Sequence, residues 1–191
     1  ASDGVKIVDI TPPSVTVTPD PGVITTDGDG LNDATVIHAL ITDRTTVVEW
    51  RLDILDPAGA KVFARPVEYV STTRVEADLP WDGMASGKRL PGGTYRVVAY
   101  ATDIGGHAAL GEAPLLICDQ FMGVGEEGGE KVCVCPDRDN DGYTDMRCGG
   151  TDCDDYDRMK HPGAYEDCTA DMNCDGKPVI CDTGKKCLDG Y

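Results

Sequence analysis

The distribution of cysteine constrains this chain more than any other feature. Eight of the nine cysteines lie between Cys133 and Cys187, and the ninth is Cys118. Dense cysteine in a short acidic segment indicates a disulfide framework formed in an oxidising compartment. A zinc site is the alternative, but this part of the chain offers one close pair, Cys133-Val-Cys135, and one histidine, His161. Because nine is odd, one thiol is free, bound to metal or paired with another chain.

The candidates for disulfide bonding are Cys118, Cys133, Cys135, Cys148, Cys153, Cys168, Cys174, Cys181 and Cys187. Their spacing does not define the connectivity. Strain disfavours a bond between Cys133 and Cys135, and Cys118 is a candidate for linking the first part of the chain to the second.

Acidic residues exclude several classes of partner. The 191 residues carry 34 acidic and 17 basic side chains, a formal net charge of −17. A surface of this charge repels phosphate backbones and anionic membranes, so we expect no nucleic-acid partner. No stretch approaches the roughly 18–20 apolar residues of a spanning helix, so we expect no membrane insertion. The chain starts at Ala1 without a charged n-region or an apolar segment, and we expect a secreted protein whose signal peptide has been removed.

The first part of the chain predicts strands rather than helices. Short runs rich in β-branched residues alternate with Pro, Gly and Asp turns, as in an antiparallel sandwich. In the run 47–55, alternation places Val48, Trp50, Leu52 and Ile54 on the apolar face. The expected strands are 5–10, 14–18, 35–41, 47–55, 60–64, 94–101 and 114–118.

Three motifs in this part resemble the FlgD-type Ig-like domain. They are the segment 27–33 (DGDGLND), the segment 79–95 with its Trp81-Asp82-Gly83 and Gly-Thr-Tyr elements, and the turn 101–106 (ATDIGG). The resemblance implies an Ig-like β-sandwich over residues 20–118, of a kind used in extracellular bacterial proteins. It departs from the family at Thr25-Thr26, where a Ser-Pro-Asn lead-in is usual. Trp81 is expected to anchor the edge of the core.

The glycine-rich loop 27–33 has two interpretations. Asp27, Asp29 and Asp33, with Asn32 beside them, present oxygens at alternate positions that can converge on calcium. The same residues also favour a solvated turn closed by Asx hydrogen bonds.

The strongest motif is the run from Asp137 to Asp145 (DRDNDGYTD). Carboxylates at 137, 139 and 141 have calcium-loop spacing, Gly142 allows a sharp turn, and the carbonyl of Tyr143 is the next expected ligand. The twelfth position is Cys148 instead of the glutamate of an EF-hand, so further ligands must come from elsewhere.

Residues 136–177 resemble the MopE-type metal-binding motif and the thrombospondin type 3 calcium repeat. The shared order is the DxDxDGY loop, Asp152-Cys153-Asp154-Asp155, a Pro-Gly-Ala segment before Glu166, and Asn173-Cys174-Asp175-Gly176. It implies secretion, bound Ca²⁺ and local disulfides. The expected ligands are Asp137, Asp139, Asp141, Tyr143, Asp145, Asp152, Asp154, Asp155 and Glu166.

The predicted fold is therefore an Ig-like antiparallel β-sandwich followed by a small disulfide-rich module stabilised by calcium. The predicted domains are an N-terminal extended segment 1–19, the sandwich 20–118 and an acidic cysteine-rich module 119–191. The module is too acidic and too poor in large apolar residues to fold without calcium and disulfides.

Catalytic motifs are absent from the sequence, so we expect a protein that is not an enzyme. Two functions remain. The first is a structural or adhesive protein of the bacterial surface, including a fibre subunit whose segment 1–19 adds to a neighbour's sheet edge or binds other cell-surface proteins. The second is extracellular copper binding, for which Met146, Met159, Met172 and His161 supply soft or borderline donors.

Overall fold

The computed structural model describes residues 9–28, 30–166 and 170–177. The chain divides into two compact units. The sandwich unit is Ala1–Gln120 with Glu126–Val132, and the C-terminal unit is Phe121–Gly125 with Cys133–Tyr191. Within the described ranges, no helix reaches the length and apolarity needed to cross a bilayer.

Nearly all regular structure in the described residues is β. The elements are β1 (Ser14–Asp20), β2 (Val23–Ile24), β3 (Thr35–Leu55), β4 (Lys61–Trp81), β5 (Met84–Ala85), β6 (Lys88–Arg89), β7 (Gly93–Asp103), β8 (Ala108–Ile117), β9 (Gly123–Glu127), β10 (Glu130–Val134) and the 3₁₀ helix η1 (Met146–Cys148). The main sheet has the order β1-β3-β7-β8-β2, and β4 also pairs with β3. The pair β5–β6 and the pair β9–β10 form separate two-stranded sheets.

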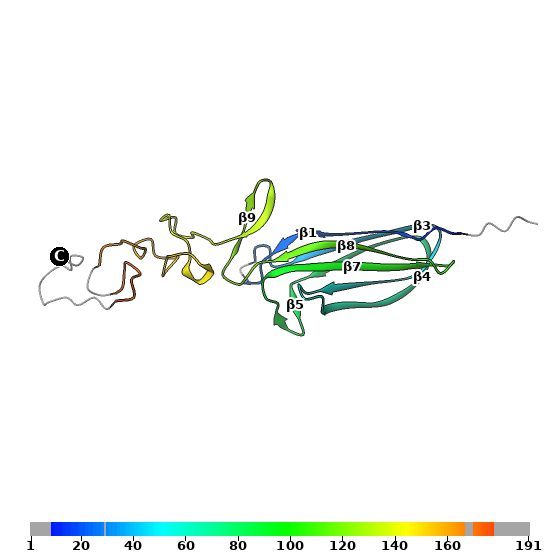
Figure 1. Ribbon diagram of the computed structural model, residues 1–191, viewed down its shortest axis with the longest axis horizontal. Coiled ribbons are helices and arrows are strands. Elements are labelled where there is room, and N and C mark those ends of the chain that lie inside the picture. Colours follow the sequence, from blue (N-terminus) through cyan, green and yellow to red (C-terminus); the bar gives the residue numbers. More distant parts are fainter. Residues whose placement is uncertain (1–8, 29, 167–169, 178–191) are drawn as a thin grey trace, which may run out of the picture. The chain divides into compact units, whose positions relative to one another are not determined.

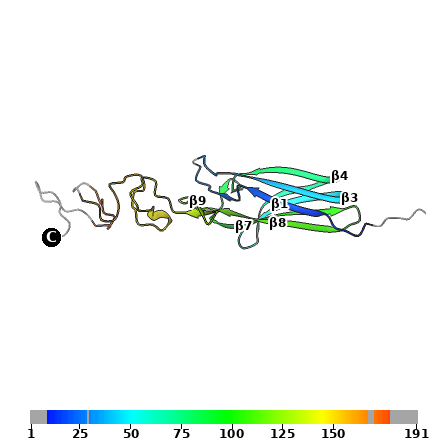
Figure 2. The same ribbon diagram turned by 90° about the horizontal axis from the view of Figure 1, so that it is seen from above.

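The sandwich unit is organised around β3, which pairs with three other strands. Its first half pairs antiparallel with β1, its second half pairs with β7, and β4 pairs with both halves. A strand has two edges, so β1 and β7 occupy the same edge of β3 in succession. The register shift between Thr42 and Val47 marks the bend at which β3 and β4 pass from one layer to the other. Figures 1 and 2 show the long strands stacked in two layers.

The predicted antiparallel sandwich is confirmed, with two differences. The runs 35–41 and 47–55 are one continuous strand. Of the expected strand 5–10, only residues 9 and 10 are described and they are not in a strand; the first described strand begins at Ser14, which pairs within its own chain. Trp50, Leu52 and Ile54 are buried as expected. Val48 is only partly buried, and Val47 takes the core position instead, because a bulge between Val47 and Glu49 changes the alternation.

Two aromatic residues anchor the core through a polar atom as well as through their rings. Trp81 is 5% exposed, packs against Phe63, and donates from Nε1 to the Met84 carbonyl at 3.2 Å. Tyr95 is fully buried near the start of β7 and donates its hydroxyl to the Pro91 carbonyl at 2.9 Å. A buried tyrosine bonded to backbone a few residues upstream is typical of Ig-like sandwiches.

Glycine at position 111 lets β8 approach β1 across the sandwich. A Cβ on Gly111 would lie well inside van der Waals contact of the Val15 carbonyl oxygen, which is backbone and cannot rotate away. The absence of a side chain at this position therefore allows β1 to cover the core at Val17.

We expect Gly111→Ala to destabilise the sandwich unit by about 1–3 kcal/mol, the usual effect of overpacking. Urea unfolding followed by tryptophan fluorescence measures this directly, because both tryptophans, Trp50 and Trp81, belong to this unit. Gly22→Ala is the matched control, since the nearest atom to its Cβ is the Pro19 carbonyl oxygen at an ordinary 3.8 Å. Equal stability of the two variants would contradict the close approach of β1 and β8.

Candidate cation site in the C-terminal unit

The loop 137–143 is curled by its own hydrogen bonds so that its aspartates point inward. The Asp141 amide donates to Asp137 Oδ1 and to Asp139 Oδ1, both at 3.1 Å, and the Gly142 amide donates to Asp137 Oδ2 at 3.0 Å. Asn140 and Gly142 adopt left-handed backbone angles, φ 60° and 96°, which close the turn. Carboxylate oxygens of Asp137, Asp139 and Asp141 lie within 4.8 Å of one another.

Asp152 joins this loop from a separate segment. It is fully buried, and its backbone carbonyl accepts from the Met146 amide at 2.8 Å. Its Oδ1 accepts from the Asp154 amide at 2.8 Å. Asp139 Oδ2, Asp141 Oδ2 and Asp152 Oδ2 are buried and make no hydrogen bond with the protein. Three buried carboxylate oxygens of this kind call for a partner that the described protein atoms do not supply, and a cation suits their charge.

The accumulation of negative charge in the site raises the pKa values of two of its carboxyl groups. Burial raises the pKa of Asp139, and the charges of Asp141, Asp137 and Asp155 raise it further. Burial also raises the pKa of Asp152, with contributions from the charges of Asp141, Asp139 and Asp155. The same carboxylates therefore repel one another unless a cation lies between them.

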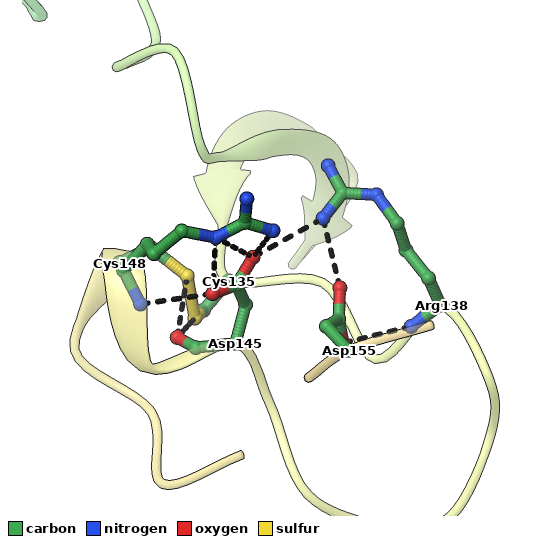
Figure 3. The surroundings of a disulfide bond; sticks show 6 residues. Cys135, Arg138, Asp145, Cys148 and Asp155 are labelled. Atoms are coloured by element: carbon green, nitrogen blue, oxygen red, sulfur yellow. Dashed lines mark hydrogen bonds and ion pairs between the residues drawn. A yellow bond between two sulfur atoms is a disulfide. The ribbon is translucent and has the colours of Figure 1, made fainter. Parts of the chain in front are cut away.

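Other aspartates predicted as ligands are paired with basic side chains (Figure 3). Asp145 accepts from the Arg147 side chain at 2.9 Å and caps η1, and its pKa is lowered chiefly by this hydrogen bond. Asp155 accepts from Arg138 Nη1 at 2.8 Å and from the Arg138 amide at 3.0 Å.

Asp154, the third of these residues, is bound by Lys160 Nζ at 2.7 Å. The structure thus clusters Asp137, Asp139 and Asp141 and places Asp152 near enough for their charges to act on it. It gives Asp145, Asp154 and Asp155 salt-bridge partners instead. The ring of Tyr143, another predicted ligand, stacks on His161 with 5.0 Å between centroids.

A second loop, residues 171–177, has the same pattern of backbone hydrogen bonds as the first. The Asp175 amide donates to Asp171 Oδ1 at 3.2 Å and to Asn173 Oδ1 at 3.0 Å, and the Gly176 amide donates to Asp171 Oδ2 at 2.9 Å. The fourth and sixth positions, Cys174 and Gly176, are again left-handed. Sequence reasoning missed Asp171, although the DxNxDG spacing of 171–176 was the signal that identifies it.

Glu166 lies beside this second loop. It is 8% exposed, and its Oε1 accepts from the Asn173 amide at 3.3 Å.

Two disulfides hold the two loops in place. Cys135–Cys148 encloses the first loop, and Cys153–Cys174 connects the residue after Asp152 to the second loop. Closing segments of 13 and 21 residues contributes about 3 kcal/mol each in the chain-entropy account. Cys118 and Cys133 are also disulfide-bonded, and no cysteine among the described residues is free. Cys168, Cys181 and Cys187 lie outside the described residues.

The loop 27–33 of the sandwich unit differs from the two loops of the C-terminal unit in its hydrogen bonds. Asp33 is engaged by backbone, accepting from the Gly28 amide at 2.9 Å and from the Gly30 amide at 2.6 Å. Asn32 is left-handed, and the Asp27 carbonyl accepts from Arg89 at 3.0 Å. Asp29 lies outside the described residues. In the described part of this loop, the Asx-turn interpretation accounts for the observed contacts of Asp33.

No model of a known protein family matches the chain, and no curated protein matches it. The resemblances to FlgD-type and MopE-type proteins therefore depend on the motifs alone.

The chain is similar to several solved structures at low identity, including these three. The CARDB domain of the PF1109 protein from Pyrococcus furiosus, in complex with di-metal ions, is 9% identical, with a TM-score of 0.37 over 55% of this chain and 91% of that one. OgpA from Akkermansia muciniphila is 11% identical, with a TM-score of 0.39 over 66% of this chain and 31% of that one. The PmoD soluble domain from Methylocystis sp. is 13% identical, with a TM-score of 0.31 over 55% of this chain and 90% of that one. These values are too low to assign an activity, a metal or a partner to this chain.

The raised pKa values predict how the cation-free C-terminal unit responds to pH. Because Asp139 and Asp152 hold protons at higher pH when folded than when unfolded, stability falls as pH rises from the ordinary carboxyl value of 3.8 through the raised pKa values. Asp145 and Asp175 have lowered pKa values, so their contributions are lost only as pH falls below 3.8.

In excess chelator, hydrogen-exchange protection of residues 137–157 should therefore be greater at pH 4, close to the ordinary carboxyl value, than at pH 7, after correction for intrinsic exchange. The difference should be up to about tenfold for each unit of pKa shift. Greater protection at pH 7 would show that these carboxylates do not repel one another in the folded unit.

Proposed function

We propose that the C-terminal unit is a calcium-binding module of an extracellular protein. The observation that carries the proposal is the cluster of carboxylates of Asp137, Asp139 and Asp141, in which Asp139 Oδ2 and Asp141 Oδ2 are buried without a protein donor. Asp152 Oδ2, also buried without a donor, belongs to a neighbouring segment close enough for these charges to act on it. Asp137 and the carbonyl of Tyr143 are the further ligands that the loop spacing predicts. The loop 171–177, with Glu166 beside it, is a second site of the same kind. Disulfides and secretion belong to the same proposal, because disulfides persist in oxidising compartments.

Calcium suits these donors better than copper does. Carboxylate, amide and backbone oxygens are hard ligands, whereas Cu(I) prefers thioether and thiolate sulfur. The side chains of Met146 and Met159 are more than half exposed, and the cysteines described near the loops are in disulfides. The copper alternative is therefore a competing outcome of the metal titration.

Removing one inward carboxylate should weaken calcium binding by at least about tenfold, the scale on which metal sites respond to altered ligands. Asp139→Asn and Asp141→Asn are the test variants, since asparagine retains an oxygen for the loop hydrogen bonds. Isothermal titration of the oxidised, chelator-treated protein measures the affinity. Asp157→Asn is the matched control, because Asp157 lies 3.7 Å from Lys160 in an exposed ion pair.

A calcium affinity that is unchanged in both test variants would refute the site. Tight Cu(I) binding with weak Ca²⁺ binding would instead support the copper function. Calcium should also raise the hydrogen-exchange protection of residues 137–175 in the wild type, because the ion neutralises the repelling charges.

The function proposed for the whole chain is structural. In this proposal the sandwich unit is a spacer or fibre element, as the FlgD-type resemblance implies, calcium stiffens the C-terminal unit, and neither is an enzyme. The open edge of β4 supports self-association, because among the described strands β4 pairs with β3 alone. Val67 and Tyr69 are exposed on this 21-residue strand, and an unpaired edge is a template for another strand. Attachment to other cell-surface proteins is the alternative use of the same edge.

Light scattering on the non-reduced protein in millimolar calcium should therefore give a mass of many subunits. Tyr69→Lys should lower that mass toward the 20.3 kDa monomer, since lysine on an edge strand opposes pairing. Leu31→Lys is the control, because Leu31 is also exposed but lies in the loop before β3, outside every described strand. A wild-type mass of 20.3 kDa would leave a monomer that acts through another protein.

A further inference from the structure

A second group of metal-ligating side chains lies in the sandwich unit, at the turn between β7 and β8. Asp103 is the last residue of β7, and His107 immediately precedes β8. Asp9 reaches the same place from the segment before β1. Ligand atoms of the three residues lie within 4.8 Å of one another.

The turn holds Asp103 and His107 in a fixed arrangement. Asp103 is 1% exposed, and its Oδ1 accepts from the His107 amide at 2.8 Å. Its Oδ2 lies 2.9 Å from His107 Nδ1. The imidazole occupies the space that a side chain on Gly105 would need, since a Cβ there would lie 2.9 Å from the ring. Glycine at position 105 therefore leaves the imidazole room to lie beside the carboxylate.

Asp9 is held from the other side by two threonines. Thr45 donates its hydroxyl to Asp9 Oδ2 at 2.6 Å, and Thr11 donates its amide and its hydroxyl to Oδ1 at 3.1 Å and 2.9 Å. The hydrogen bond from Thr45 is the main cause that lowers the pKa of Asp9 to about 2, with the charge of His107 as a smaller one. Asp9 is thus a carboxylate at any physiological pH.

We propose that Asp9, Asp103 and His107 form a site for a first-row transition-metal ion such as Zn²⁺, with water completing the coordination. An imidazole nitrogen with two carboxylate oxygens is a donor set that zinc accepts and that calcium, which takes oxygen ligands, does not favour. Ligands about 2.1 Å from a zinc ion lie about 3.4 Å apart at the tetrahedral angle, which is compatible with the separations in this cluster. Metal binding at His107 Nδ1 replaces the hydrogen bond between this atom and Asp103 Oδ2.

The consequence of such a site is control of the N-terminal segment. Asp9 precedes β1, whereas Asp103 and His107 belong to a turn 94 and 98 residues later in the sequence. An ion bound by all three fixes the segment before β1 to the end of the sandwich. This function is independent of the calcium module, which uses oxygen donors in the other unit.

The test uses the full-length oxidised protein in millimolar calcium, which keeps the calcium loops filled. Zinc affinity is measured by isothermal titration, and Co²⁺ serves as a spectroscopic probe through its visible absorption. We expect one zinc equivalent in the wild type and an affinity loss of at least about tenfold in Asp9→Asn and in His107→Gln. His38→Gln is the matched control, because His38 also lies 2.7 Å from an aspartate, Asp78, but on exposed strands and outside the three-ligand cluster.

His107→Gln also removes a side-chain partner of the buried Asp103. A loss of zinc affinity in this variant could therefore result from a folding defect. Asp9→Asn leaves the Asp103–His107 pair in place and keeps the test decisive. Zinc should slow hydrogen exchange at Thr11 in the wild type but not in Asp9→Asn. Absence of zinc binding, binding unaffected by Asp9→Asn, or an equal loss in His38→Gln would each overturn the proposal.

Discussion

Buried negative charge without a protein countercharge is the constraint on which the C-terminal unit depends. Backbone amides satisfy one oxygen of each inward aspartate and so fix its orientation, but they leave the second oxygen of Asp139, Asp141 and Asp152 without a donor. The basic side chains nearby do not donate to these oxygens. Arg138 is bound to Asp155, and Arg147 is bound to Asp145. These salt bridges fix the segments around the site, and the unpartnered carboxylate oxygens remain available to a cation.

The sandwich unit is stabilised by a different balance of forces. Its core is a continuous apolar cluster drawn from β1, β2, β3, β4, β7 and β8, with the buried rings of Trp50, Trp81 and Tyr95 within it. Burial of apolar area at about 25 cal/mol per Å² does not depend on an ion. In the C-terminal unit, Ala164 is the one buried apolar residue outside the cysteines among those described, and disulfides take the place of a core. Chelation should therefore act on one unit and leave the other folded.

The sequence predicts what local patterns determine and misses what depends on contacts between distant segments. Turn residues and alternation were enough to predict the sandwich and the burial of Trp50, Leu52 and Ile54. The DxDxDG spacing was enough to predict the first loop. Alternation alone could not place Val47 in the core instead of Val48, because a bulge set by pairing with β7 shifts the register. Pairing of Asp155 with Arg138, 17 residues earlier, likewise follows from the folded loop and has no signature in the spacing.

The two acidic loops differ in charge and are joined covalently, and both facts bear on how they act together. The first loop presents three carboxylates, whereas the second has Asn173 at the third position and so carries one charge fewer. Calcium affinity rises with the number of charged ligands, so the function proposed above has the first loop fill at a lower calcium concentration than the second. Cys174 occupies the fourth position of the second loop and is bonded to Cys153, the residue after Asp152. Ordering Asp152 around an ion therefore also restricts the second loop, and its later filling begins from a partly organised backbone.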